Sequence, residues 1–118
     1  MIDLTCDSDK LQVICNKSGE KMREIFGDKL INVILYGSYA RGDYNQYSDI
    51  DVMALVDMEK LELGKYRRKV TSFMSDIGLE HDVLLSIKLQ DKVTFDKWQY
   101  DLPLFMNVKK EGIVINDL

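Results

Sequence analysis

The sequence predicts an α/β fold in which a small mixed β-sheet is flanked by helices. Apolar runs of strand length alternate along the chain with segments of helical periodicity. The link between the first two strand-like runs is about ten residues, which is too short for a parallel crossover. The link between the second and third runs is long enough for a right-handed crossover. We therefore expect the order αβαβαβα(β) within one domain, residues 1–118.

The first half of the chain predicts a helix, a strand and a short helical turn. The stretch "DSDKLQVICNKSGEKMREIFGDKL" has apolar residues at helical spacing, with Asp7 or Ser8 as the N-cap and Gly27 as the stop. The run "LINVILYG" is almost continuously apolar and ends at Gly37, which is typical of a central strand buried on both faces. The polar stretch "SYARGDYNQYS" can hold one helical turn before the next strand.

The second half predicts two more strands, further helices and an edge strand. The run "DIDVMALV" is the second strand, and "MEKLELGKYRRKVTSFMSDIG" is a helix that Gly78 ends. We expect "LEHDVLLSI" to be the third strand, with Asp82 at its start. Two short helices follow in "LQDKVTFDKWQYDLPLFMNVKKEG", the second beginning at Pro103 and ending at Gly112, and "IVI" can add a last edge strand.

This topology gathers three chain segments at one rim of the sheet. The first two strands are expected to be antiparallel, and the second and third parallel. The end of the first strand, the start of the second and the start of the third then lie side by side.

Two aspartates stand at that rim. Asp49 and Asp51 are two residues apart, so their side chains share a face, with backbones roughly 6.5 to 7 Å apart. Carboxylates this close repel each other unless a cation neutralises them, and oxygen donors suit Mg²⁺ or Mn²⁺. Asp82 could complete a site for two ions and act as the base for an incoming hydroxyl, with Glu80 as a competing candidate.

Gly37, Ser38 and Arg41 form the other half of the expected site. A glycine at the end of a strand lets the backbone approach a phosphate closely, and Ser38 adds a hydroxyl donor. Arg41 could contact a phosphate or pair with Asp43 or Asp49.

The composition limits the partners. A net charge of −4 and a pI near 4.9 argue against direct nucleic-acid binding, so a metal ion would have to supply positive charge to a nucleotide site. Cys6 and Cys15 are expected to be free thiols in a reducing cytosol. No apolar run of membrane-spanning length and no signal-peptide pattern stand in the sequence, which predicts a cytoplasmic protein. The basic cluster Lys65–Lys69 is either a solvated helix face or a docking patch.

The spacing of these residues resembles that of a known family. Gly37-Ser38, ten intervening residues and then Asp49-Ile50-Asp51 are similar to the signature of the nucleotidyltransferase superfamily that includes DNA polymerase beta. The phrases "GSYARGD" and "KKEGIVI" resemble the minimal nucleotidyltransferases, or MNT proteins, in particular. The resemblance implies a two-metal transfer of AMP from ATP to a hydroxyl. Gly37 and Ser38 would hold the triphosphate, Asp49 and Asp51 would bind both metals, and Asp82 would be the third carboxylate.

The resemblance also implies a partner. Many MNT proteins are antitoxins of HEPN-domain ribonuclease toxins, in some cases by adenylylating a toxin tyrosine, so a HEPN toxin and a hetero-oligomer are expected. Transfer to a small hydroxylated molecule such as an aminoglycoside is an alternative. A binding-only antitoxin with a vestigial metal site is another.

Overall fold

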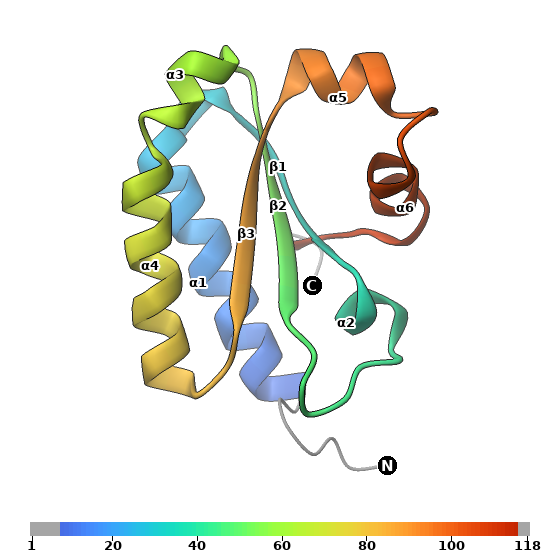
Figure 1. Ribbon diagram of the computed structural model, residues 1–118. Helices are drawn as coiled ribbons and strands as arrows, with labels where there is room; N and C mark the ends of the chain where they lie inside the picture. The colour runs from blue at the N-terminus through green and yellow to red at the C-terminus, as the bar shows by residue number, and fades with distance from the viewer. Residues whose placement is uncertain (1–7, 116–118) are drawn as a thin grey trace.

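A four-stranded mixed sheet with helices on both faces forms the centre of the protein (Figure 1), as the computed structural model of residues 8–115 shows. The predicted fold class is confirmed. The elements in chain order are α1 (Ser8–Phe26), the short 3₁₀ helix η1 (Gly27–Lys29), β1 (Leu30–Tyr36), α2 (Ser38–Arg41), β2 (Ile50–Val56), α3 (Lys60–Gly64), α4 (Arg67–His81), β3 (Leu85–Asp91), α5 (Lys92–Trp98), α6 (Pro103–Glu111) and β4 (Ile113–Val114).

The strand order and directions follow from the lengths of the links. The order across the sheet is β3-β2-β1-β4. β1 is antiparallel to β2 and to β4, whereas β2 is parallel to β3. Both arguments from link length are therefore confirmed, and the expected last edge strand is β4. The carboxyl end of β1 and the amino ends of β2 and β3 lie at the same rim.

The two faces of the sheet have separate apolar layers. Val33 and Leu35 of β1 belong to the larger core cluster, which includes residues of α1 and α4. Ile34 lies on the other face, in a smaller cluster with Phe95 of α5 and Phe105 of α6. Figure 1 shows α1 and α4 on one side of the sheet and α5 and α6 on the other. Successive side chains of a strand point to opposite faces of the sheet, so neighbouring residues in each strand pack into different apolar layers.

The helix expected over residues 58–78 is two helices. α3 ends at Gly64 and α4 begins at Arg67, because the amides of Lys65 and Tyr66 bond to carbonyls three residues back, at Glu62 and Leu63. This tighter turn ends one helix before the next begins. The ring of Tyr66 packs against Phe26 with centroids 5.1 Å apart, which holds the junction against α1.

The third strand begins later than the sequence predicts. α4 continues through Gly78 to His81, and Asp82 caps it in the left-handed conformation with φ of 55°. Aspartate tolerates this conformation better than most residues, so Gly78 was not needed as the stop. Gly78 instead allows close packing, since an added Cβ would lie 3.0 Å from the carbonyl oxygen of Val83. β3 begins at Leu85, where burial starts to alternate.

The remaining predicted elements agree closely with the structure. α1 ends at Phe26, before Gly27, and α6 runs from Pro103 to Glu111. Cys15 is buried in the core, whereas Asp7 and Cys6 lie outside the described residues.

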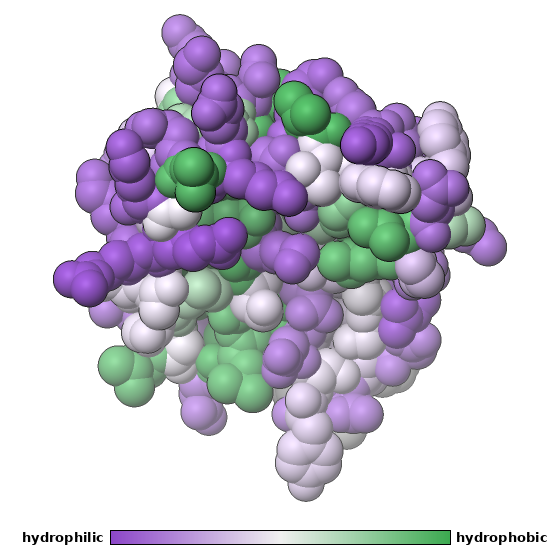
Figure 2. All heavy atoms as spheres, turned by 45° about the horizontal axis from the view of Figure 1, so that its top comes forward, coloured by the Kyte–Doolittle hydropathy of each residue, from purple (hydrophilic) through white to green (hydrophobic). Residues whose placement is uncertain are grey.

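Within residues 8–115, every helix is too short or too polar to cross a lipid bilayer. Figure 2 turns the end with α3 and α5 toward the viewer and shows mostly hydrophilic residues, with apolar ones in small separate groups.

A methionine pair tests the packing of α5 and α6 on the sheet. Met53 is fully buried in the smaller cluster, whereas Met106 of α6 is 47% exposed. Met53→Ala should lower the free energy of unfolding by about 2–5 kcal/mol, because it leaves a cavity. Met106→Ala should change it by less than about 0.5 kcal/mol. Urea denaturation followed by circular dichroism measures both, and equal effects would contradict the assigned layer.

Candidate active site

The two halves of the Gly-Ser and Asp-x-Asp pattern touch each other. Gly37 follows β1 with φ of 77° and ψ of −155°, a conformation that is essentially restricted to glycine. A Cβ added to Gly37 would lie 2.5 Å from Oδ2 of Asp51. β1 and β2 are in register at Tyr36 and Asp51, so the sheet itself brings the end of β1 to this carboxylate. Gly37 therefore provides the space that the Asp51 side chain occupies.

The loop between α2 and β2 is held by local contacts that fix the approach to Asp49. Tyr39 and Tyr44 stack with ring centroids 4.1 Å apart and planes 13° apart. Oδ1 of Asn45 accepts a hydrogen bond from the backbone amide of Tyr47 at 2.7 Å, and the backbone amide of Asn45 donates to Oγ of Ser48 at 2.9 Å. These turns deliver the chain to Asp49 at the rim, where the side chain is exposed.

Asp51 is the electrostatically perturbed member of the pair. Burial raises the pKa of its carboxyl, the charge of Asp49 raises it further, and the charge of Arg41 partly opposes both. The pKa of the half-buried Tyr36 is also raised, by burial and then by the charge of Asp51. Two carboxylates therefore interact at this rim, as their spacing predicts.

Arg41 connects α2 to the end of α6. Its Nε donates to Asp43 at 3.1 Å and its Nη1 donates to Glu111 at 3.2 Å. These two bonds raise the pKa of Arg41. Pairing with Asp43 is one of the alternatives that the sequence left open for Arg41, and it is present; Glu111 is a second partner that the sequence did not predict. The pairing of β4 with β1 explains this contact, because it brings Glu111, just before β4, close to Gly37 at the end of β1.

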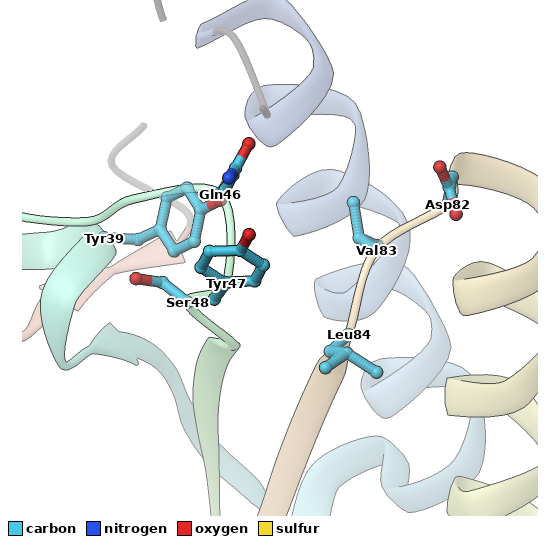
Figure 3. Close-up of a pocket in the computed structure, with 7 residues that line it drawn as sticks. All are labelled: Tyr39, Gln46, Tyr47, Ser48, Asp82, Val83 and Leu84. Carbon is cyan, nitrogen blue, oxygen red and sulfur yellow. The ribbon is translucent and has the colours of Figure 1, made fainter. Parts of the chain in front are cut away.

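Asp82 does not stand in the strand beside Asp51. It is an exposed residue at the end of α4 and faces a pocket of about 240 Å³ opposite Tyr47 and Ser48 (Figure 3). The β3 residue in register with Asp51 is Ser86, which is half-buried. Within residues 8–115, no three carboxylate, histidine or cysteine side chains lie together as a metal site. The expected three-aspartate cluster is thus absent from this structure, because α4 extends over the residues that should have begun β3.

The competing candidate Glu80 is also placed elsewhere. It lies in the last turn of α4, where its carboxylate pairs with Nζ of Lys17 on α1 at 3.1 Å. Both side chains are on the α1 and α4 layer, so Glu80 serves the contact between these helices.

The remaining pair of carboxylates fits a magnesium ion. Asp49 and Asp51 offer hard oxygen donors, one exposed and one half-buried, and their mutual repulsion favours a bound cation. Mg²⁺ is commonly held by one or two carboxylates together with water and substrate phosphate oxygens. A second ion would have fewer protein ligands here than the resemblance implies.

Comparison with known families identifies the family of the domain. The nucleotidyltransferase domain model matches residues 15–112, so the chain belongs to the nucleotidyltransferase domain family. Two relatives from Methanocaldococcus jannaschii are named as candidate protein adenylyltransferases. One is 45% identical over 62 residues, which are 52% of this chain and 61% of the relative. The other is 38% identical over 74 residues, which are 63% of this chain and 48% of the relative. The matches thus span about half to three-fifths of these relatives.

Solved structures show the same fold. A candidate nucleotidyltransferase from Sulfolobus solfataricus aligns with a TM-score of 0.52 at 20% identity, covering 87% of this chain and 80% of that one. A mutant form of the toxin–antitoxin pair MntA–HpeT includes a chain that aligns with a TM-score of 0.51 at 19% identity, covering 86% of this chain and 71% of that one.

Replacing Gly37 tests the contact with Asp51. Gly37→Ala should destabilise the chain by roughly 1–3 kcal/mol from its backbone conformation, with an added cost from the clash with the carboxylate. Gly42→Ala is the matched control, since Gly42 also has a positive φ, of 86°, but an added Cβ would meet open space. Thermal unfolding of both variants compares them. Equal losses would show that the predicted clash is absent.

Asp51→Asn tests the cost of the carboxylate pair. Because the folded chain raises the pKa of Asp51 above its ordinary value of 3.8, the metal-free native state holds this proton to higher pH than the unfolded state does. The penalty is absent below the ordinary value and complete above the raised folded value. In EDTA at pH 7 the variant should therefore have a higher melting temperature than the natural chain, and the difference should shrink as the pH falls through this window.

Repeating the melting-temperature measurement with Mg²⁺ in place of EDTA tests whether the carboxylate pair binds a cation. Mg²⁺ should raise the melting temperature of the natural chain and have little effect on the Asp51→Asn variant, because the cation loses a ligand. Asp76→Asn, on the exposed side of α4, is the control and should behave like the natural chain. If Asp51→Asn is no more stable than the natural chain in EDTA at pH 7, the repulsion between Asp49 and Asp51 is contradicted.

Proposed function

We propose that this chain transfers AMP from ATP to a protein hydroxyl in a Mg²⁺-dependent reaction. The observation that supports the proposal is the close approach of Gly37 to the Asp51 carboxylate, because a glycine backbone that could approach a phosphate then lies beside a carboxylate pair that could bind a metal ion. The names of the two Methanocaldococcus jannaschii relatives support protein adenylylation in particular.

The residues of the rim would bind different parts of the metal–nucleotide complex. Asp49 and Asp51 would hold Mg²⁺, which when bound offsets the charge of the triphosphate. Gly37 and Ser38 would hold the phosphate chain, by close backbone approach and by the Ser38 hydroxyl. Arg41 would contact a phosphate by exchanging one of its carboxylate partners, Asp43 or Glu111, for it.

The transfer forms one bond and breaks one. The acceptor oxygen bonds to the α-phosphorus of ATP, and the bond from that phosphorus to the bridging oxygen of pyrophosphate breaks. The proton of the acceptor hydroxyl passes to water. The protein contributes mainly position and electrostatic stabilisation, as is general in phosphoryl-type transfers.

We infer a tyrosine of a HEPN-type toxin as the acceptor and the toxin as the partner. The support is the resemblance to MNT proteins, together with a structural neighbour that is a chain of the toxin–antitoxin pair MntA–HpeT. A binding-only antitoxin is the second candidate function, and it is favoured by the absence of a third carboxylate beside Asp51 within residues 8–115.

A labelling experiment decides between these functions. The chain is incubated with Mg²⁺ and α-labelled ATP, with and without the product of the neighbouring gene as the candidate partner. Label on that partner is expected for an adenylyltransferase. Tight binding without label would instead support the binding-only antitoxin, and label on an added aminoglycoside would support small-molecule transfer.

Asp49→Ala should reduce the labelling rate by about 100-fold or more, because it removes a charge that positions the metal. The exposed position predicts an unchanged circular dichroism spectrum. In EDTA at pH 7 the melting temperature should not fall, because the variant also removes the repulsion between Asp49 and Asp51. Asp101→Ala, in the exposed α5–α6 turn, is the matched control and should label at the natural rate. Full activity of the Asp49 variant would overturn the assigned metal site.

A further inference from the structure

The sheet face that carries Asp51 also carries a lysine on the neighbouring strand. β2 and β3 are parallel and in register, with Asp51 beside Ser86 and Met53 beside Lys88. Leu85, Ile87 and Leu89 belong to the core cluster under α1 and α4. The residues between them, Ser86 and Lys88, therefore lie on the opposite face, together with Asp51 and Met53.

Lys88 lies within reach of a group bound at Asp51. Adjacent strands are about 4.8 Å apart and two residues along a strand add about 6.6 Å, so the Cα atoms of Asp51 and Lys88 are about 8 Å apart. The four-carbon stem of a lysine can span much of that distance. The side chain of Lys88 is exposed, whereas Ser86 between it and the rim is half-buried.

The charges at this end of the molecule leave a role for a second cation. Arg41 already donates to two carboxylates, Asp43 and Glu111. Among the described residues, Lys88 takes part in no salt bridge or side-chain hydrogen bond. A nucleoside triphosphate brings several negative charges to a rim that already holds Asp49 and Asp51, and one Mg²⁺ offsets only part of them.

We propose that Lys88 binds the phosphate chain of the nucleotide from β3, opposite the Gly37–Ser38 backbone. This inference rests on the proposed function and adds a phosphate-binding residue to it. Lys88 would act by direct contact with phosphate oxygens. Ser86, which is uncharged, would leave the position beside Asp51 free of the negative charge that a third carboxylate would add there.

Calorimetry with Mg²⁺ and two probes tests the proposal, namely a non-hydrolysable ATP analogue and inorganic tripolyphosphate. Lys88→Ala should weaken the binding of each probe roughly tenfold, because one charge-assisted hydrogen bond is lost. Lys88→Arg should restore most of the affinity, since the positive charge is kept. Adenosine, which has no phosphate, should bind the natural chain and the Lys88→Ala variant alike.

Lys69→Ala is the matched control, because Lys69 is also exposed but lies on α4, on the other layer of the molecule. It should leave all affinities unchanged. A lysine on an edge strand can also serve to prevent strand pairing between molecules. A Lys88→Ala variant that forms oligomers in size-exclusion chromatography but binds both probes like the natural chain would overturn the inference. Failure of the natural chain to bind either probe would overturn the proposed function as well.

Discussion

The close approach of Gly37 to the Asp51 carboxylate is the constraint on which the rest of this rim depends. The distance of 2.5 Å that a Cβ would have from Oδ2 leaves room for hydrogen and nothing larger. The register of β1 against β2 sets this approach, because Tyr36 pairs with Asp51. A one-residue shift of that register would turn Asp51 into the core layer of α1 and α4. The same strand pairing that builds the hydrophobic core therefore also positions the charged site, and the two cannot be changed independently.

Much of this arrangement could be predicted from sequence, for identifiable reasons. Link lengths set the strand directions, and the ten residues between Ser38 and Asp49 identify the paired motif. The start of β3 could not be predicted in this way, because the end of α4 is decided by the ability of Asp82 to adopt a left-handed conformation. Glycine is the commoner residue there, so the sequence favoured Gly78 as the stop. The pairing of Arg41 with Glu111, 70 positions apart, depends on tertiary placement that local patterns do not encode.

The later start of β3 changes the charge balance of the site. A carboxylate at the position of Ser86 would place three negative charges within neighbouring strand positions. With Ser86 there, Asp51 lies beside a hydroxyl-bearing residue of β3, and the next β3 residue on the same face is Lys88. The rim is thus less acidic than the family resemblance implies, which suits the binding of an anionic phosphate chain more than the binding of two divalent cations.

The C-terminal helix is part of the site for an electrostatic reason. Arg41 belongs to α2, a helix of four residues that cannot be stable by itself. Its guanidinium is held by Asp43 in the adjoining loop and by Glu111 at the end of α6, while β4 fixes the segment after Glu111 against β1. Exposed ion pairs contribute little to stability singly, so the pairing with Glu111 matters chiefly for orientation. It keeps a cation close enough to Asp51 to lower the pKa of that carboxyl against the opposing effects of burial and Asp49. A chain that lacked α6 would keep the Asp-x-Asp motif but lose one of the two anchors that hold its arginine.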